Sequence, residues 1–160
     1  MYKRQIYEWR ADNLPLALSR RLMHQGGAAL VIDYGHVESA AGDTLQAVGG
    51  HAFVDPLKTP GEVDLTAHVD FQALALAAES MGARVSGPIE QGTFLRHLGI
   101  EQRAATLKSL ALPEKRAEIE SAVKRLLGEG RTEMGKLFKV LGIAQPSLGK
   151  LPGFEPEPSL

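Results

Sequence analysis

The chain has 160 residues, of which 44% are hydrophobic, and this is enough to form the core of one domain. Its 18 basic and 19 acidic residues nearly cancel, so no basic surface field argues for nucleic acid binding. Cysteine is absent, which excludes disulfide bonds and thiolate metal sites, and no apolar run approaches the length of a membrane span.

The first predicted element is a helix that begins at Asn13, a residue type that caps helices well. Leu14, Leu18 and Leu22 recur at helical spacing, and the glycine pair 26–27 can end the helix in a left-handed conformation. The ten residues at the start of the chain, MYKRQIYEWR, contain no apolar stretch, so we expect no signal peptide there.

The second predicted element is a strand over residues 28–33. Its apolar residues are continuous rather than alternating, which favours a strand buried on both faces. The segment 37–70 that follows is rich in Gly, Asp and Pro. We expect it to be mostly loop, with short strands at LQAV and HAFV.

The rest of the chain favours helices and two more strands. Asp70 can cap a helix that ends at Gly82. The later predicted elements are a strand at ARVSGPIEQ with a turn at Gly87-Pro88, a helical turn at TFLRHLGI, a helix over about 101–110, a helix from Pro113 with a buried stripe of Ile119, Val123, Leu126 and Leu127, and a strand at LFKVLGIA.

The order of helices and strands indicates an α/β fold. Three convincing strands are few for an open parallel sheet, so the chain is predicted to be part of a larger sheet. We treat residues 1–160 as one partial domain, with 6–145 as its folded part. Residues 1–5 resemble a translated adapter sequence, and the proline-rich tail 146–160 is expected to be irregular.

A polar cluster ends the first predicted strand: Asp33, Tyr34, Gly35 and His36. Ligands of open α/β sheets bind beyond the carboxyl ends of strands, so this cluster is a candidate site. A purely structural interpretation is also open. In it, Asp33 caps a turn, Gly35 has a positive φ, and His36 is exposed to solvent.

Other chemistries have weaker support in the sequence. HEXXH is absent, no serine lies in G-x-S-x-G, and the one G-x-G, at Gly128 to Gly130, follows a predicted helix rather than a strand. We therefore predict no metal site, although six residues have suitable ligand chemistry. These residues are His36, His51, Asp55, Asp64, His68 and Asp70.

A series of longer motifs carries a family resemblance. These motifs are, in order, LVIDYGH, GDTLQAV, HAFVDPL, PGEVDLTAHVDF, GPIEQGTFLRHLGI and MGKLFKVLGI. Together they resemble the C-terminal half of the MidA family of class I S-adenosylmethionine-dependent methyltransferases, which includes the mitochondrial complex I assembly methyltransferase. The resemblance runs from about Leu14 to Ile143.

The resemblance implies a Rossmann-like sheet of seven strands with additional helices. Residues 28–33 would be its fifth strand, and the segments near Val85 and Val140 would form an antiparallel pair at one edge. The family's cofactor is S-adenosylmethionine, but its glycine-rich loop and ribose-binding acid lie upstream of the matched region. We therefore expect the cofactor-binding residues outside this chain, and weak cofactor binding by the chain alone.

The same resemblance implies roles at the strand end. Asp33 is the expected partner of a guanidinium, because a carboxylate matches its fork, and His36 can take up a proton; these two are the predicted catalytic residues. Tyr34 and Gly35 are expected to contact substrate. Three further residues are expected to line the same crevice: Asp64, Thr66 and His68.

The predicted function is therefore the acceptor-side half of a methyltransferase that modifies arginine in a protein, with a respiratory complex I subunit as one candidate substrate. No nucleic acid or membrane partner is expected. The location would be the cytoplasm in a bacterium or the mitochondrial matrix in a eukaryote. The alternative is a scaffold module that binds a protein partner without chemistry. The sequence leaves the oligomeric state open.

Overall fold

The computed structural model describes residues 13–40, 42, 44–50, 52–130 and 133–154. In chain order the elements are α1 (Asn13–Gln25), β1 (Ala28–His36), β2 (Gln46–Gly49), β3 (Ala52–Val54), β4 (Asp64–Thr66), β5 (Val69–Asp70), α2 (Phe71–Ser80), β6 (Arg84–Glu90), α3 (Gln91–His97), α4 (Ile100–Leu110), α5 (Pro113–Leu127), β7 (Phe138–Ala144) and the 3-10 turn η1 (Pro146–Leu148). None of the described helices is long and apolar enough to span a membrane.

The main sheet has four strands in the order β5-β1-β7-β6. Strand β7 lies between β1 and β6 and pairs antiparallel with both. The antiparallel pair near Val85 and Val140 is therefore present, with β6 at the edge, as the resemblance predicts. In the described part of the chain, the other side of β1 has a strand partner only at Gly35 and His36, through the parallel strand β5.

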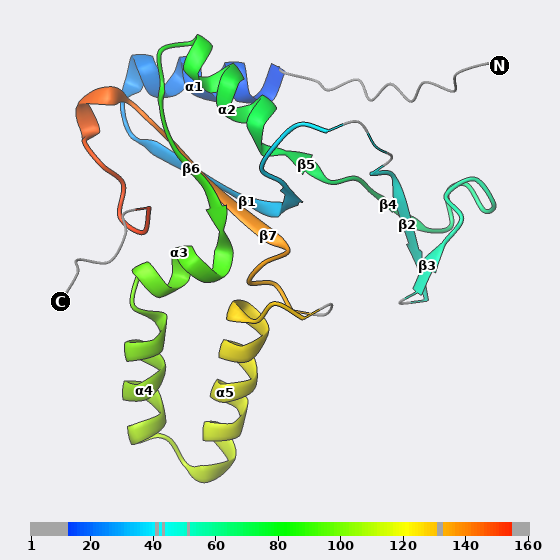
Figure 1. The fold of residues 1–160 in the computed structure, drawn as a ribbon, viewed down its shortest axis with the longest axis vertical. Coiled ribbons are helices and arrows are strands. Elements are labelled where there is room, and N and C mark those ends of the chain that lie inside the picture. The colour runs from blue at the N-terminus through cyan, green and yellow to red at the C-terminus, as the bar shows by residue number, and fades with distance from the viewer. Residues whose placement is uncertain (1–12, 41, 43, 51, 131–132, 155–160) are drawn as a thin grey trace.

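Helices α1 and α2 lie side by side over one face of this sheet (Figure 1). Helix α2 begins as expected, because Asp70 Oδ1 accepts a hydrogen bond of 2.9 Å from the Ala73 backbone N–H. Helix α1 also begins at Asn13, but Leu14 is exposed; Leu22 is buried in the core, and Leu18 is partly buried against it. The buried core cluster consists of Leu22, Phe71, Ala78, Ala83, Leu141 and Ile143.

The expectation that β1 is buried on both faces is wrong for this chain. Ala29 and Val31 pack against the core cluster, whereas Leu30 and Ile32 are 52% and 47% exposed. Side chains of a strand point alternately to opposite faces, and α1 and α2 cover only one of these faces. The continuous apolar sequence of β1 therefore does not mean that both of its faces are buried.

The segment 37–70 contains more strand than predicted. Strands β2 and β3 lie where LQAV and HAFV favoured them, and β4 joins them in a small sheet of order β3-β2-β4. Strands β4 and β5 have three and two residues, too short for a visible alternation of polar and apolar side chains. Figure 1 shows the small sheet beyond the ends of β1 and β5.

Strand β6 passes through Gly87-Pro88 rather than turning back there. Its register against β7 shifts between Ser86 and Ile89, which makes the predicted turn a bulge within the strand. Gly87 has a φ of 84°, and a Cβ there would lie 2.7 Å from the Val140 carbonyl oxygen. Glycine is the residue that this conformation and close approach permit.

The second half of the chain ends in a helical hairpin and an irregular segment. Helices α4 and α5 pack antiparallel and extend away from the sheet (Figure 1), and Leu127 of the predicted stripe is buried. After η1, Leu151 and Phe154 lie against Gly142 in β7, where they cover part of the sheet face opposite α1 and α2. Residues 155–160 and 1–12 fall outside the described part, so the domain boundaries stay a prediction.

Candidate functional site

The polar cluster at the end of β1 is divided between the two faces of the sheet. Because side chains alternate along a strand, Asp33 and Gly35 share the face of Val31, which packs against the core. Tyr34 and His36 point to the opposite face. The structure therefore does not bring the two predicted catalytic residues, Asp33 and His36, together on one surface.

Gly35 is required by a close contact and not by a turn. It has no positive φ, so the structural interpretation is wrong on this point. A Cβ at this position would lie 2.1 Å from the Val69 carbonyl oxygen and 2.9 Å from the Phe71 ring. Glycine thus allows β5 to approach β1, which aligns His36 with Asp70 in the parallel register.

The structure brings Tyr34 and His68 together. Their rings meet edge to face with centroids 5.7 Å apart, and Phe138 packs on Tyr34 in the same manner at 5.8 Å. The Gln46 side-chain amide lies 3.5 Å from Nε2 of His68. This aromatic group joins β1, β7, β2 and the segment before β5 at the carboxyl end of β1.

His36 lies beside a buried carboxylate. Its Nε2 is 3.5 Å from Oδ2 of Asp70; the side chain of His36 is 25% exposed and that of Asp70 is 0% exposed. The Nε2 atom itself is buried and makes no hydrogen bond to the residues that the structure describes. Asp70 Oδ2 also accepts a hydrogen bond of 2.6 Å from the Ser39 hydroxyl.

The sequence analysis considered Asp70 only as a helix cap and as a possible metal ligand, and it missed this pairing. The available signal was the histidine at the end of one strand and the acid at the end of another. The parallel register that sets them opposite each other depends on the fold and is not visible in the spacing.

On the face covered by α1 and α2, Asp33 begins a row of charges across three strands. It lies opposite Lys139 of β7, which in turn lies opposite Glu90 of β6. One oxygen of Asp33 accepts a hydrogen bond of 2.8 Å from the Tyr34 backbone N–H. Burial lowers the pKa of Lys139; the Glu90 carboxylate opposes this shift, and Lys136 adds to it. Lys139 was not predicted as part of the site.

The remaining predicted residues are less closely connected to the strand end. Thr66 is half-buried in β4 opposite Gln46, the residue whose amide reaches His68. Asp64 is exposed in the same strand, opposite Val48. Asp64 and Thr66 therefore lie on the small sheet, and their roles stay predictions.

Within the described residues, no group of three or more His, Asp or Glu side chains could hold a metal ion. His51 lies outside the described part of the chain. Asp55 has a structural role, because its Oδ1 accepts a hydrogen bond of 2.9 Å from the Leu57 backbone N–H within a turn.

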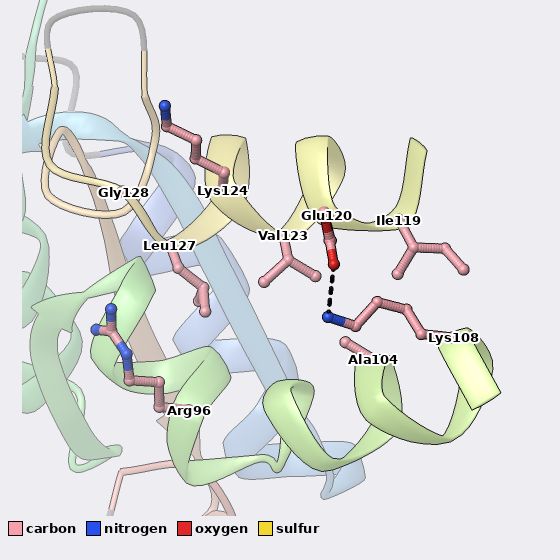
Figure 2. A pocket seen from close by; sticks show the side chains of 9 residues that line it. All are labelled: Arg96, Ala104, Lys108, Ile119, Glu120, Val123, Lys124, Leu127 and Gly128. Carbon is pink, nitrogen blue, oxygen red and sulfur yellow. Dashed lines mark hydrogen bonds and ion pairs between the residues drawn. The ribbon is translucent and has the colours of Figure 1, made fainter. Parts of the chain in front are cut away.

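A cavity of about 310 Å³ lies elsewhere, between α3, α4 and α5 (Figure 2). Its apolar lining comes from Ala104, Ile119, Val123 and Leu127. The three basic side chains at its rim all have acidic partners: Lys108 pairs with Glu120 at 3.0 Å, Arg96 with Glu101 at 3.6 Å and Lys124 with Glu133 at 3.9 Å. The residues that line the cavity come from α3, α4, α5 and Gly128, and none of them belongs to the strand-end site.

Comparison with known proteins identifies the family. Residues 3–89, more than half of the chain, match the family model described as "Putative S-adenosyl-L-methionine-dependent methyltransferase". The chain belongs to this family. The resemblance inferred from the motifs is confirmed.

Curated relatives are similar over most of the chain. The protein arginine methyltransferase NDUFAF7 homolog of Drosophila melanogaster, a mitochondrial protein, is 39% identical over 140 residues, which are 84% of this chain and 31% of that protein. Human NDUFAF7 is 46% identical over 90 residues, 56% of this chain and 20% of that protein. The chain thus spans less than a third of the length of these relatives.

Two solved structures from Burkholderia thailandensis have the same fold. Both are 30% identical to the chain, and the match covers 88% of it. One aligns with a TM-score of 0.68 over 37% of that protein, and the other, solved with bound S-adenosyl-homocysteine, with a TM-score of 0.65 over 36%. The prediction of an α/β methyltransferase fold with mixed final strands is confirmed.

Proposed function

We propose that this chain is the acceptor-side part of a S-adenosylmethionine-dependent methyltransferase that modifies arginine in a protein. The observation that carries the proposal is the group of Tyr34, His36 and His68 at the carboxyl end of β1, in a chain of a methyltransferase family. Ligands of open α/β sheets bind beyond this end of the strands. The names of the curated relatives support arginine as the acceptor.

The residues at the strand end suit a guanidinium. A planar cation stacks on or beside an aromatic ring, which Tyr34 provides on the face of His36. The predicted carboxylate partner, Asp33, lies on the opposite face of β1, so its pairing with the acceptor is a separate hypothesis with its own test. His36 is the group that takes up the proton that the acceptor nitrogen loses. Asp64, Thr66 and His68 would line the approach from the small sheet.

The chain's own residues do not fit the cofactor by themselves. Its only G-x-G lies between Gly128 and Gly130, after helix α5, whereas a cofactor loop follows a strand and opens a helix. The cofactor would supply the methyl group, and residues outside this chain would hold it. Calorimetric titration of the chain with S-adenosylmethionine should show no measurable binding. Micromolar affinity would mean that these residues hold the site after all.

The function is tested by methyl transfer in the full-length protein that contains this segment. Tritium from labelled S-adenosylmethionine should appear in arginine of an acceptor protein, with a respiratory complex I subunit as the first candidate. His36→Gln should abolish most of this transfer, while Leu110→Ala, an exposed position on α4, should leave it unchanged. Equal rates in both variants would contradict the proposal.

The relatives' names point to mitochondria, and the Burkholderia structures show that the fold also occurs in bacteria.

One observation favours a second candidate, a scaffold that binds a protein without chemistry. Phe53, Leu57 and Leu65 of the small sheet and its loops are exposed apolar side chains. Such side chains occur at protein interfaces. A full-length protein that binds an acceptor through this surface but transfers no methyl group would support the scaffold and exclude the enzyme.

A further inference from the structure

His36 and Asp70 form an arrangement that the proposed methyl transfer does not by itself require. In a neutral imidazole one ring nitrogen carries a proton and the other has a lone pair. Nε2 of His36 is buried, has no hydrogen-bond partner within the described part of the chain, and lies 3.5 Å from Asp70 Oδ2. A lone pair at Nε2 would face a negative oxygen, whereas an N–H there would point its positive end at it.

Asp70 is held firmly in this position. Its Oδ1 accepts the Ala73 backbone N–H at 2.9 Å, and its Oδ2 accepts the Ser39 hydroxyl at 2.6 Å. The backbone N–H of Ser39 in turn donates to the Gln72 side chain at 2.7 Å. The carboxylate also lies at the N-terminus of α2, where the helix dipole stabilises negative charge. The residue cannot easily turn away from His36.

We propose that Asp70 is a positioning residue that holds His36 in the tautomer with its proton on Nε2. Nδ1 is then the basic atom of the imidazole, whose side chain is 25% exposed at the end of β1. The role of Nδ1 in taking up a proton rests on the proposed function, but the tautomer does not. Contacts between histidine and a carboxylate are often long before a substrate binds, so a distance of 3.5 Å suits this role.

The variant Asp70→Asn separates this role from helix capping. Asparagine caps helices as well as aspartate does, so α2 should be retained. Its oxygen would accept the Ala73 N–H, and its amide nitrogen would then occupy the place of Oδ2, facing His36. A donor at this place favours a lone pair on Nε2. The tautomer of His36 should therefore switch.

Nitrogen-15 NMR of the imidazole reads the tautomer directly, with His36→Gln to assign the signal. At about pH 8.5, where an ordinary imidazole is neutral, wild type should carry its proton on Nε2. Asp70→Asn should move the majority of it to Nδ1, a change of up to about tenfold in the tautomer ratio, as one ordinary hydrogen bond gives. Ser39→Ala removes a neighbour of Asp70 but keeps the charge, so its tautomer should stay as in wild type.

A wild-type proton on Nδ1, or an unchanged tautomer in folded Asp70→Asn, would overturn the proposal, whatever the protein's activity. In the full-length protein, Asp70→Asn should also lower kcat for methyl transfer without raising KM for the acceptor, and it should have no further effect in a His36→Gln background. Additive losses would show that Asp70 does not act through His36. If wild type transfers no methyl group, the proposed function fails, while the NMR result still decides the tautomer.

Discussion

The two faces of β1 differ in how their side chains are used. On one face Ala29 and Val31 pack against the core beneath α1 and α2. On the same face Gly35 lies in close contact with the backbone of Val69 and the ring of Phe71. On the other face Leu30 and Ile32 are half exposed. Further along, Tyr34 contacts His68, in the segment before β5, and His36 contacts Asp70 of β5. One strand therefore contributes to the core on one side and to the candidate site on the other.

This comparison explains why the apolar run was misleading. In an isolated segment, branched apolar residues on both faces indicate burial on both faces. Here the second face has no helix over Leu30 and Ile32 in the described part of the chain. Changes on the core face should therefore alter stability, and changes on the open face should alter recognition or chemistry.

The largest loss of stability is expected from a substitution on the core face at a position with no free space. Gly35→Ala would place a methyl group 2.1 Å from the Val69 carbonyl oxygen, so β5 must move away from β1. We expect a loss of about 3 kcal/mol or more in the free energy of unfolding, measured by denaturant titration. Gly42→Ala is the matched control, since no atom of the described residues lies within 4 Å of its added Cβ. Equal stability of the two variants would contradict the close approach.

Two leucines on neighbouring strands test the comparison itself. Leu141 is fully buried on the core face, so Leu141→Ala should cost about 2–5 kcal/mol of unfolding free energy. Leu30 is 52% exposed on the open face, so Leu30→Ala should cost about 1 kcal/mol or less. Similar losses would show that something covers the open face in solution.

The parts of the fold that follow local rules could be predicted. Glycines 26 and 82 end their helices as expected, and Asp70 caps α2, because these features depend on a few neighbouring residues. The strands at ARVSGPIEQ and LFKVLGIA were found for the same reason. The family resemblance added their antiparallel pairing, which local patterns do not contain.

The site was predicted less completely, because it depends on register. The sequence places Asp33 and His36 three residues apart, and only the alternation of an actual strand assigns them to opposite faces. The contact between His36 and Asp70 spans 34 positions and requires the two-residue strand β5. Lys139 was overlooked because no sequence motif marks a single lysine within an apolar strand as part of a site.

The role of Asp33 tests whether chemistry is confined to the open face. Asp33→Asn keeps the shape and can still accept the Tyr34 N–H, but it loses the charge. If Asp33 pairs with a cationic acceptor, the loss of about 1.5–3 kcal/mol should lower methyl transfer by the full-length protein roughly tenfold to a hundredfold. Cofactor affinity should hardly change. Normal transfer by folded Asp33→Asn would restrict the acceptor contacts to the face of Tyr34 and His36.

The smallest change in stability is expected at Lys139, which lies between Asp33 and Glu90 on the core face. Burial lowers its pKa below the ordinary value of 10.5, so folding disfavours its charged form. The unfolded chain then binds more protons between the two pKa values, and the stability of wild type rises with pH through this window. Lys139→Gln removes this cost and should be more stable than wild type at neutral pH by a few tenths of a kcal/mol, a small figure because solvent screens the partly exposed ammonium.

The advantage of the variant should shrink as the pH rises towards 10.5, as thermal unfolding at a series of pH values would show. If Lys139→Gln is instead less stable than wild type at neutral pH, and its deficit shrinks as the pH rises, the carboxylates of Asp33 and Glu90 stabilise the charged lysine, and this row of charges supports the fold.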